Sequence, residues 1–274
     1  MRIQVTAKEY GARQLDEGTL KSAVEAIRLD GYVVLGGVVG LAVLDLMKAK
    51  LDEDTAEVLR RGEWEGTGFS GHLSQSMPRS REHIHSDVVT NPLLIQVTSK
   101  ILGDGVHNHF YNGNTNMPGS QIQPLHRDAP YLWPDPVHPV TSLVINICPI
   151  EVDESNGATE LWPGTHAILG STAVPQAAED ERRVLVPPVR TVTLKGDAVV
   201  RDPRLWHRGT SNPGTEVRHM VAMVHSKWFY QRDTTIPVTR GAVHSFDDDV
   251  LTTRVEIVPD DYDYLSEVVS TRGS

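Results

Sequence analysis

The stretch Gln123-Pro124-Leu125-His126-Arg127-Asp128 places an imidazole and a carboxylate two residues apart in an extended run. Successive side chains of a strand alternate between its two faces, so His126 and Asp128 point the same way and Arg127 points the other way. One strand therefore offers two metal ligands on one face. The third ligand would have to come from a neighbouring strand far away in the sequence, which favours a barrel of two facing sheets.

His207 is the candidate for that third ligand, because the extended run 201–206 meets a turn there. Two imidazoles and one carboxylate on one face of a metal leave the opposite face open, as in non-haem Fe(II) oxygenases. Open positions are needed by a co-substrate and by O2, whereas a fully ligated ion would be inert. The set His126, Asp128 and His207 therefore indicates a catalytic iron site rather than a structural metal site.

Arg218 follows the turn 209–214 on a predicted antiparallel strand from Val217 to Trp228. On that strand its guanidinium would lie near the metal, where a planar fork suits the far carboxylate of a dicarboxylic co-substrate. We expect that co-substrate to be 2-oxoglutarate. His219 faces the other side of the same strand and is not expected to be a ligand.

Several segments resemble the phytanoyl-CoA dioxygenase (PhyH) family of Fe(II)/2-oxoglutarate oxygenases. They are Gln123-Pro124-Leu125-His126-Arg127-Asp128, Asn156-Gly157-Ala158-Thr159 with Pro163-Gly164-Thr165-His166, Trp206-His207-Arg208-Gly209-Thr210 with Arg218, and Asp30-Gly31-Tyr32-Val33-Val34-Leu35. The resemblance covers about residues 18 to 230. It implies a mainly β fold with flanking helices and a double-stranded β-helix core of the jelly-roll, cupin-like type.

The resemblance also implies roles for individual residues. His126, Asp128 and His207 would bind iron, and Arg218 would anchor 2-oxoglutarate. Members often carry a hydroxyl residue two positions after the second histidine, but this chain has Gly209 there and Thr210 next. The family includes acyl-CoA hydroxylases, hydroxylases of small polar solutes, halogenases and tailoring enzymes of natural-product pathways, so membership alone does not define a substrate.

Other polar and aromatic residues near these motifs are candidates for the pocket. The candidate neighbours of 2-oxoglutarate are Gln123, Thr159, Asn114 and Thr210. The candidate substrate contacts are Phe69, His72, Met77, Tyr131, Trp133 and Trp162. Amphipathic rings suit an apolar pocket, with simple packing as the alternative, and a turn is the alternative for Thr159. Most of the other histidines are expected to be surface or hydrogen-bonded structural residues.

Length and composition predict a single domain over residues 1–274, and periodicity predicts its elements. Helices are expected at Thr19–Leu29, Leu41–Arg61 and Asn91–Leu102, and a strand at Tyr32–Leu35 after Gly31. Helical additions would occupy about 18–103, the jelly-roll core about 106–230, and a C-terminal extension about 231–274. The stretch 62–81 has no clean period and is a candidate lid.

Composition narrows the class of partner. A net charge of −10 disfavours nucleic acid, and no apolar run is long enough for a membrane span. No signal-peptide core is visible, and the single Cys148, expected to be buried in a strand, suits a reducing compartment; both favour the cytoplasm. The missing basic cluster argues against a CoA thioester and favours a neutral or weakly polar small molecule. A monomer or homodimer is expected.

We therefore expect an enzyme that oxidises a C–H bond of a small organic molecule, such as a natural-product intermediate. Hydroxylation is the default outcome, and desaturation or cyclisation would share the first steps. Halogenation is disfavoured because Asp128 occupies the position that a halide would need. Two alternatives stay open: a cupin-like metalloenzyme that does not use 2-oxoglutarate, and a non-catalytic ligand-binding protein on the same fold.

Overall fold

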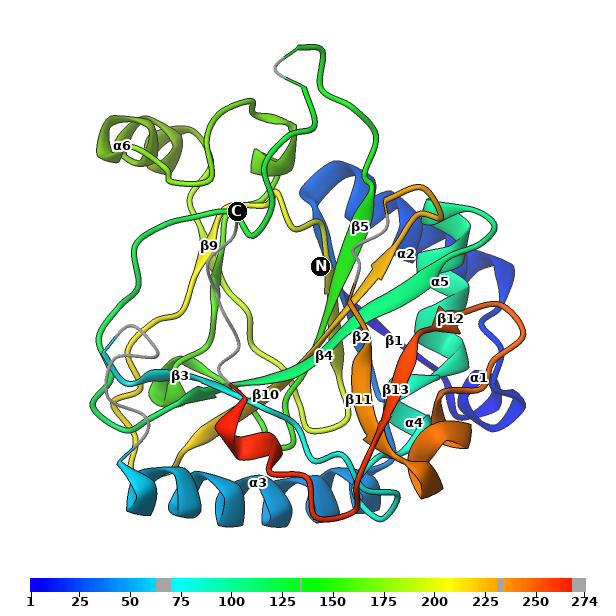
Figure 1. Ribbon diagram of the computed structural model, residues 1–274. Coiled ribbons are helices and arrows are strands. Elements are labelled where there is room, and N and C mark those ends of the chain that lie inside the picture. Colours follow the sequence, from blue (N-terminus) through cyan, green and yellow to red (C-terminus); the bar gives the residue numbers. More distant parts are fainter. Residues whose placement is uncertain (63–69, 134, 231–233, 268–274) are drawn as a thin grey trace.

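Two facing β-sheets form the centre of the computed structural model, which describes residues 1–62, 70–133, 135–230 and 234–267 (Figure 1). The large sheet has the strand order β1-β2-β8-β5-β10-β4-β12, and β3 also pairs with β4. Its strands are β1 (Arg2–Gln4), β2 (Tyr32–Gly36), β3 (His72–Gln75), β4 (His107–Asn116), β5 (Ser142–Ile147), β8 (Ala198–Arg201), β10 (Arg218–Ser226) and β12 (Thr252–Thr253). The small sheet has the order β7-β6-β9, with β6 (Glu160–Leu161), β7 (Val189–Arg190) and β9 (His207–Arg208).

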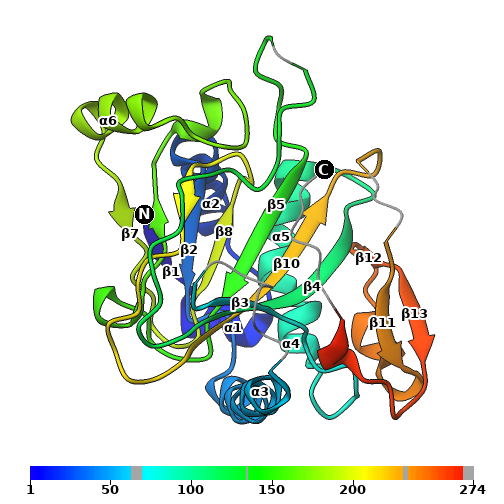
Figure 2. The same cartoon turned by 60° about the vertical axis from the view of Figure 1, so that its left-hand side comes forward.

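Helices cover the outer face of the large sheet and one end of the barrel (Figures 1 and 2). They are α1 (Ala7–Ala12), α2 (Glu17–Asp30), α4 (Ser86–Val89) and α5 (Pro92–Leu102) on the outer face, α3 (Leu41–Arg61) across the end, and α6 (Gln176–Leu185) beyond the small sheet. Short 3-10 helices occupy Glu154–Asn156, Thr165–Ala167, Arg240–Phe246 and Tyr264–Ser266, and β11 (Ile236–Thr239) pairs with β13 (Val255–Val258) as a separate sheet.

Side-chain alternation on the central strands separates the core from the interior of the barrel. On β10, Val221 and Met223 are buried in the main core, which also contains residues of α2, α3 and α5. The intervening Met220, Ala222 and Val224 are only half-buried. Because alternate residues face opposite sides of a strand, these side chains point towards the space between the two sheets. The apolar core thus lies behind the large sheet and leaves its inner face available for a site.

The predicted helices are confirmed within one or two residues. The helix expected at Leu41–Arg61 is α3, and Asn91 caps α5 by accepting hydrogen bonds from the backbone N–H groups of Leu93 and Leu94. Gly31 ends α2 in the left-handed region at φ 84°, as its position suggested. The expected return strand Val217–Trp228 is shorter and is β10.

The predicted boundaries of the jelly-roll core need correction. β1, β2 and β3, from the part expected to be helical additions, belong to the large sheet, and β12 from the C-terminal extension pairs with β4. Residues 63–69 of the predicted lid lie outside the described residues. Residues 72–75 form β3, whose backbone pairs with β4 from His72 opposite Asn116 to Gln75 opposite Gly113, so this part is a sheet edge.

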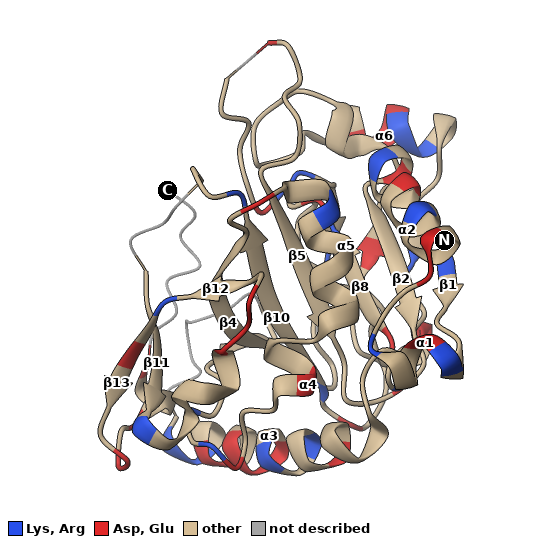
Figure 3. Cartoon of the chain, turned by 90° about the vertical axis from the view of Figure 1, so that its right-hand side faces the viewer, with Lys and Arg blue, Asp and Glu red and all other residues tan. Residues whose placement is uncertain are grey.

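Charged residues of both signs alternate along the exposed helices (Figure 3). On α3, Lys48 pairs with Asp52 at 2.8 Å and Lys50 pairs with Asp54 at 2.8 Å, each one helical turn apart. Such pairs contribute a few tenths of a kcal/mol each. Among the helices of the described ranges, none combines the length and apolar character that crossing a membrane requires.

Replacing Gly31 by Ala should destabilise the fold more than the same change at Gly62, although both glycines end helices with positive φ. A Cβ at Gly31 would lie 2.6 Å from Nδ1 of His166 and 2.7 Å from Cδ1 of Leu205, whereas a Cβ at Gly62 meets no described residue within 4 Å. Both variants share the left-handed strain of about 1–2 kcal/mol. Gly31→Ala should lose about 1–3 kcal/mol more, through overpacking.

Urea denaturation followed by circular dichroism measures the free energy of unfolding of both variants. Equal losses in Gly31→Ala and Gly62→Ala would show that the contact between the end of α2 and His166 carries no energetic weight.

Candidate metal centre and co-substrate cavity

His126, Asp128 and His207 lie together at the centre of the barrel. Their nearest ligand atoms are all within 4.8 Å of one another, the only such group of three in the described ranges. Oδ1 of Asp128 is 3.2 Å from Nε2 of His207 and 3.7 Å from Nε2 of His126. Two nitrogens and one carboxylate oxygen converge on one point, which is the donor set predicted from the sequence.

Backbone hydrogen bonds bring these residues together. The N–H of His126 donates to the carbonyl of His207 at 3.1 Å, and the N–H of His207 donates back to His126 at 3.0 Å. The N–H of Asp128 donates to the carbonyl of Pro203 at 2.8 Å. His126 is thus an isolated bridge residue rather than part of a longer strand, and the two histidines pair directly.

Arg127 points away from the centre, as the alternation predicts. Its guanidinium donates to the carbonyl of Ile168 at 2.7 Å and to that of Ser171, and it lies 5.3 Å from the ring centroid of Trp206. Arg127 therefore ties the His-X-Asp segment to the loop between β6 and α6, while its neighbours His126 and Asp128 face the metal side.

In each of the two histidines, the hydrogen bond of Nδ1 to a backbone carbonyl leaves Nε2 as the metal donor. Nδ1 of His126 lies 2.8 Å from the carbonyl oxygen of Pro124, and Nδ1 of His207 lies 2.9 Å from that of Leu205. A carbonyl oxygen can only accept, so Nδ1 carries the proton and Nε2 presents its lone pair. Burial, together with the nearby Arg201 cation, lowers the pKa of His207 to about 4, so this ring is neutral at physiological pH.

Asp128 is held ionised by its neighbours. Desolvation on its own would raise the pKa of the carboxyl, but His207 and Arg201 outweigh it and hold the pKa well below the ordinary value. Nη2 of Arg201 donates to Oδ2 of Asp128 at 2.6 Å. Sequence reasoning missed Arg201. Its position two residues after the inward-facing Val199 on β8 was the signal that could have found it.

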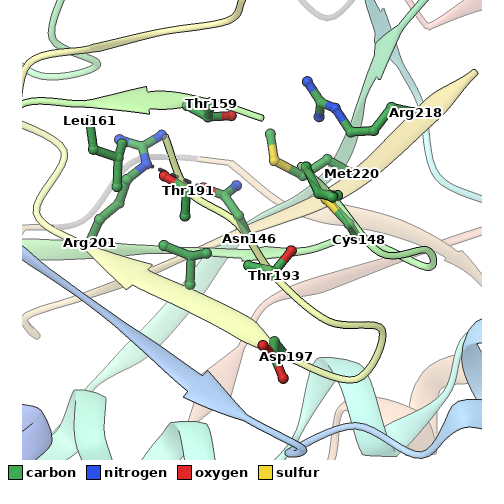
Figure 4. Close-up of a pocket in the computed structure, with 12 residues that line it drawn as sticks. Asn146, Cys148, Thr159, Leu161, Thr191, Thr193, Asp197, Arg201, Arg218 and Met220 are labelled. Carbon is green, nitrogen blue, oxygen red and sulfur yellow. Dashed lines mark hydrogen bonds between the residues drawn. The ribbon is translucent and has the colours of Figure 1, made fainter. Parts of the chain in front are cut away.

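A cavity on the inner face of the large sheet contains Arg218 (Figure 4). Arg218 is 2% exposed, and its Nε and Nη1 atoms have no hydrogen-bond partner among the described residues. The hydroxyl of Thr191, which also lines the cavity, likewise has none there. A buried cation without a partner is costly, so these groups favour a bound anion.

The predicted neighbours of the co-substrate divide into two groups. Thr159 lines the cavity, and Asn114 lies opposite Met220 in the pairing of β4 with β10, on the same inner face. Gln123 instead accepts a hydrogen bond from the N–H of Gly209 at 2.8 Å, and the buried hydroxyl of Thr210 donates to the carbonyl of Ala158 at 2.8 Å. Neither Gln123 nor Thr210 lines the cavity.

Cys148 also lines this cavity, which corrects the expectation of a thiol buried within a strand. The strand β5 ends at Ile147, and Cys148 follows it half-buried. Burial raises the pKa of the thiol although Arg218 beside it acts in the opposite direction. Cys148 is therefore a neutral neighbour of the Arg218 guanidinium.

Two predicted substrate contacts belong to the protein interior. Met77 is part of the main core behind the large sheet. Trp162 is fully buried, packs with Trp206 and donates from Nε1 to Glu160 at 3.0 Å. For Trp162 the packing alternative is the better description, and Met77 likewise packs in the core, so the structure does not support a substrate role for either.

The other predicted substrate contacts lie elsewhere. His72 on β3 is buried, and its Nε2 is 2.7 Å from the carbonyl oxygen of Gln121. Tyr131 donates from its hydroxyl to the carbonyls of His166 and Ile168. Trp133 is 45% exposed. Phe69 lies outside the described residues.

His219 faces α3, as predicted for a residue on the other side of β10 from Arg218. Its Nε2 lies 3.0 Å from Oδ1 of Asp52, and its Nδ1 lies 3.1 Å from the hydroxyl of Thr115. The prediction that His219 is not a metal ligand agrees with this position.

Comparison with known proteins places the chain in a family. The model of the phytanoyl-CoA dioxygenase (PhyH) family matches residues 27–220. The chain belongs to the phytanoyl-CoA dioxygenase family. Among similar proteins, dioxygenase trt7 of Aspergillus terreus is 27% identical over 214 residues, covering 74% of this chain and 72% of the relative. Dioxygenase af480 of Aspergillus fumigatus is 32% identical over 126 residues, covering 46% and 39%.

Solved structures share the fold of this PhyH family member. AviO1 from Streptomyces viridochromogenes superposes with a TM-score of 0.59 at 21% identity, covering 76% of this chain and 94% of that one. The non-heme alpha-ketoglutarate-dependent epimerase SnoN from nogalamycin biosynthesis gives a TM-score of 0.56 at 18% identity, covering 77% and 84%. The predicted double-stranded β-helix is confirmed. With the family match, the chain is a non-haem Fe(II)/2-oxoglutarate-dependent dioxygenase.

Replacing Asp128 or His207 by Ala should abolish metal binding and turnover while the chain stays folded, because each change removes one of three converging donors. Anaerobic calorimetric titration with Fe(II) measures the binding, and circular dichroism checks the fold. His244→Ala is the control, since His244 is exposed and pairs with Asp247 on the surface. Undiminished Fe(II) affinity in folded Asp128→Ala would contradict the assignment.

Proposed function

We propose that this enzyme oxidises a C–H bond of a small neutral organic molecule, with hydroxylation as the default outcome. Fe(II) would be held by His126, Asp128 and His207, and 2-oxoglutarate would be anchored by Arg218. The observation that carries the proposal is the buried guanidinium of Arg218, with two nitrogens unpartnered, in a cavity that also contains Arg201, the hydrogen-bond partner of Asp128.

The residues present fit both groups. Two imidazoles and a carboxylate are suitable donors for Fe(II). Arg218 stays charged and offers a fork for a carboxylate, and the unpartnered hydroxyl of Thr191 can donate to the same anion. Fe(II) and 2-oxoglutarate, when bound, supply the activation of O2 that couples oxidation of the substrate to release of succinate and CO2.

The chain's own contribution is placement and exclusion of water. Arg218 would hold and orient the far carboxylate of 2-oxoglutarate, which restricts the motion of the rest of the molecule. Leu161, Val199 and Met220 supply apolar walls to the cavity. Such walls strengthen the interaction between the guanidinium and the carboxylate, because water does not screen it there.

The apolar side chains on the inner face of the barrel favour a neutral substrate. Met220, Ala222 and Val224 of β10 are half-buried and apolar, and half-buried Phe110 precedes the core residue Tyr111 on β4. Within the cavity lining, the cations are Arg201 and Arg218. Arg201 pairs with Asp128 and Arg218 is assigned to the co-substrate, which leaves no lining cation for the phosphates of a CoA thioester.

The two alternatives from the sequence are weaker. A metalloenzyme without 2-oxoglutarate would leave the buried charge of Arg218 without a partner, and a non-catalytic protein would not need three preoriented donors. The type of oxidation depends on substrate placement. SnoN, an epimerase from nogalamycin biosynthesis, has the same fold, so the fold alone does not select hydroxylation.

Replacing Arg218 by Met should weaken 2-oxoglutarate binding about 10- to 100-fold, the equivalent of losing one charge-assisted bidentate contact. Anaerobic titration of the Fe(II)-loaded protein with 2-oxoglutarate, followed by the visible charge-transfer band of the chelate, measures the affinity. Arg218→Lys should recover part of it, because charge returns without the fork.

Thr210→Val serves as the control, because the Thr210 hydroxyl is bonded to Ala158 away from the cavity. It should leave the 2-oxoglutarate affinity unchanged. An Arg218→Met variant that chelates 2-oxoglutarate as tightly as the parent would rule out Arg218 as the anchor. Once the band is established, succinate release can be used to screen neutral substrates.

A further inference from the structure

Arg201 lines the cavity, and its side chain bonds to a candidate metal ligand. It is the last residue of β8, is 6% exposed, and extends from the large sheet towards Asp128. Nη2 donates to Oδ2 of Asp128 at 2.6 Å, and Nε donates to Oδ1 of Asn146 at 3.2 Å. The third nitrogen, Nη1, is buried and has no hydrogen-bond partner among the described residues.

We propose that Arg201 is a positioning residue with two tasks: it fixes Asp128 as a one-oxygen ligand, and its free Nη1 supplies a second cationic contact for the co-substrate. This inference rests on the proposed function, since it concerns the same metal and the same dicarboxylate. It adds a residue that neither the family motif segments nor the sequence pattern singled out.

The first task follows from the orientation of the Asp128 carboxylate. Its side chain is 37% exposed, so the surrounding surface does not restrain it tightly. Arg201 occupies Oδ2, and Oδ1 is then the oxygen that faces Nε2 of both histidines. A carboxylate tied in this way offers one oxygen to the metal. Were both oxygens to bind, one of the positions needed by the co-substrate and O2 would be lost.

The second task follows from the positions of the two arginines (Figure 4). Asn146 and Cys148 are two residues apart on β5 and its continuation, so their side chains share a face and lie about 7 Å apart along the strand. Arg201 bonds to Asn146, and Arg218 interacts with Cys148. The cavity therefore has a guanidinium near each end, and a five-carbon dicarboxylate can bridge such a span, with one carboxylate at Arg218 and the other at the unpartnered Nη1 of Arg201.

A purely structural role is the competing explanation. Arg201 joins the large sheet to the segment that follows His126, and a buried ion pair that loses one partner is costly wherever it lies. Loss of stability alone therefore does not distinguish the two roles. Metal binding, co-substrate binding and the coordination spectrum do, because a structural link would not change them in the folded protein.

The test uses Co(II) in place of Fe(II), so that binding is read without turnover or O2. We expect Arg201→Gln to bind Co(II) about 10- to 100-fold more weakly than the parent, the usual effect of losing a group that orients a ligand. Its visible Co(II) spectrum should also change, because the released carboxylate can bind through both oxygens. At saturating Co(II), 2-oxoglutarate should bind more weakly as well.

Arg201→Lys separates the two tasks and keeps the test open if the Gln variant does not fold. A lysine restores the buried charge but not the fork, so it can serve the co-substrate or Asp128 but not hold both. We expect 2-oxoglutarate affinity to recover more than the Co(II) spectrum does.

Arg79→Gln is the matched control. Arg79 is equally buried and pairs with Glu267 at 2.7 Å, but it does not line the cavity. It should lower stability and leave Co(II) and 2-oxoglutarate binding unchanged. Parent-like binding and spectrum in Arg201→Gln or Arg201→Lys would overturn the inference. A parent protein that binds neither Co(II) nor 2-oxoglutarate would instead overturn the proposed function.

Discussion

The pair of backbone hydrogen bonds between His126 and His207 is the constraint on which the site depends. These two bonds join segments that are far apart in sequence and set the two rings side by side, with centroids 4.4 Å apart. Alternation along the chain then puts Asp128 on the same side, and its own N–H is tied to Pro203. Main-chain pairing therefore places the three residues, and the bond from Arg201 acts on the carboxylate of Asp128.

The cavity on the inner face of the large sheet contains two buried arginines, and only one of them is paired with a carboxylate. Arg201 and Arg218 both lie in the cavity, yet Asp128 neutralises only the first. An unpaired charge at low dielectric is costly, and no described side chain neutralises Arg218, so its guanidinium favours a carboxylate ligand. The apolar core behind the sheet, with Ile145 and Val221, supplies the stability that tolerates this cost. Pairing this guanidinium with a carboxylate would therefore be favourable, and the proposed co-substrate would gain affinity from it.

Sequence reasoning reached the features that depend on local spacing. The His-X-Asp pair, Arg218 at the start of its strand, the helix α3 and the stop at Gly31 all follow from alternation, periodicity or turn chemistry. It failed where long-range packing decides. Nothing near Trp162 in the sequence shows that Trp206 packs against it, and nothing near Met77 shows that it enters the main core.

The same distinction explains why Arg201 was missed and Arg218 was found. Arg218 is the first residue of β10 and belongs to a motif of defined spacing. The role of Arg201, by contrast, depends on the pairing of β8 with β5 and on its contact with Asp128, which is distant in sequence. From the sequence alone, an arginine at the end of an apolar strand is predicted to be exposed to solvent. In the fold, that strand end points into the barrel, so the charge is buried and must act on something there. The candidate role of Arg201 in the site therefore follows from the pairing of β8 with β5 and not from the local sequence.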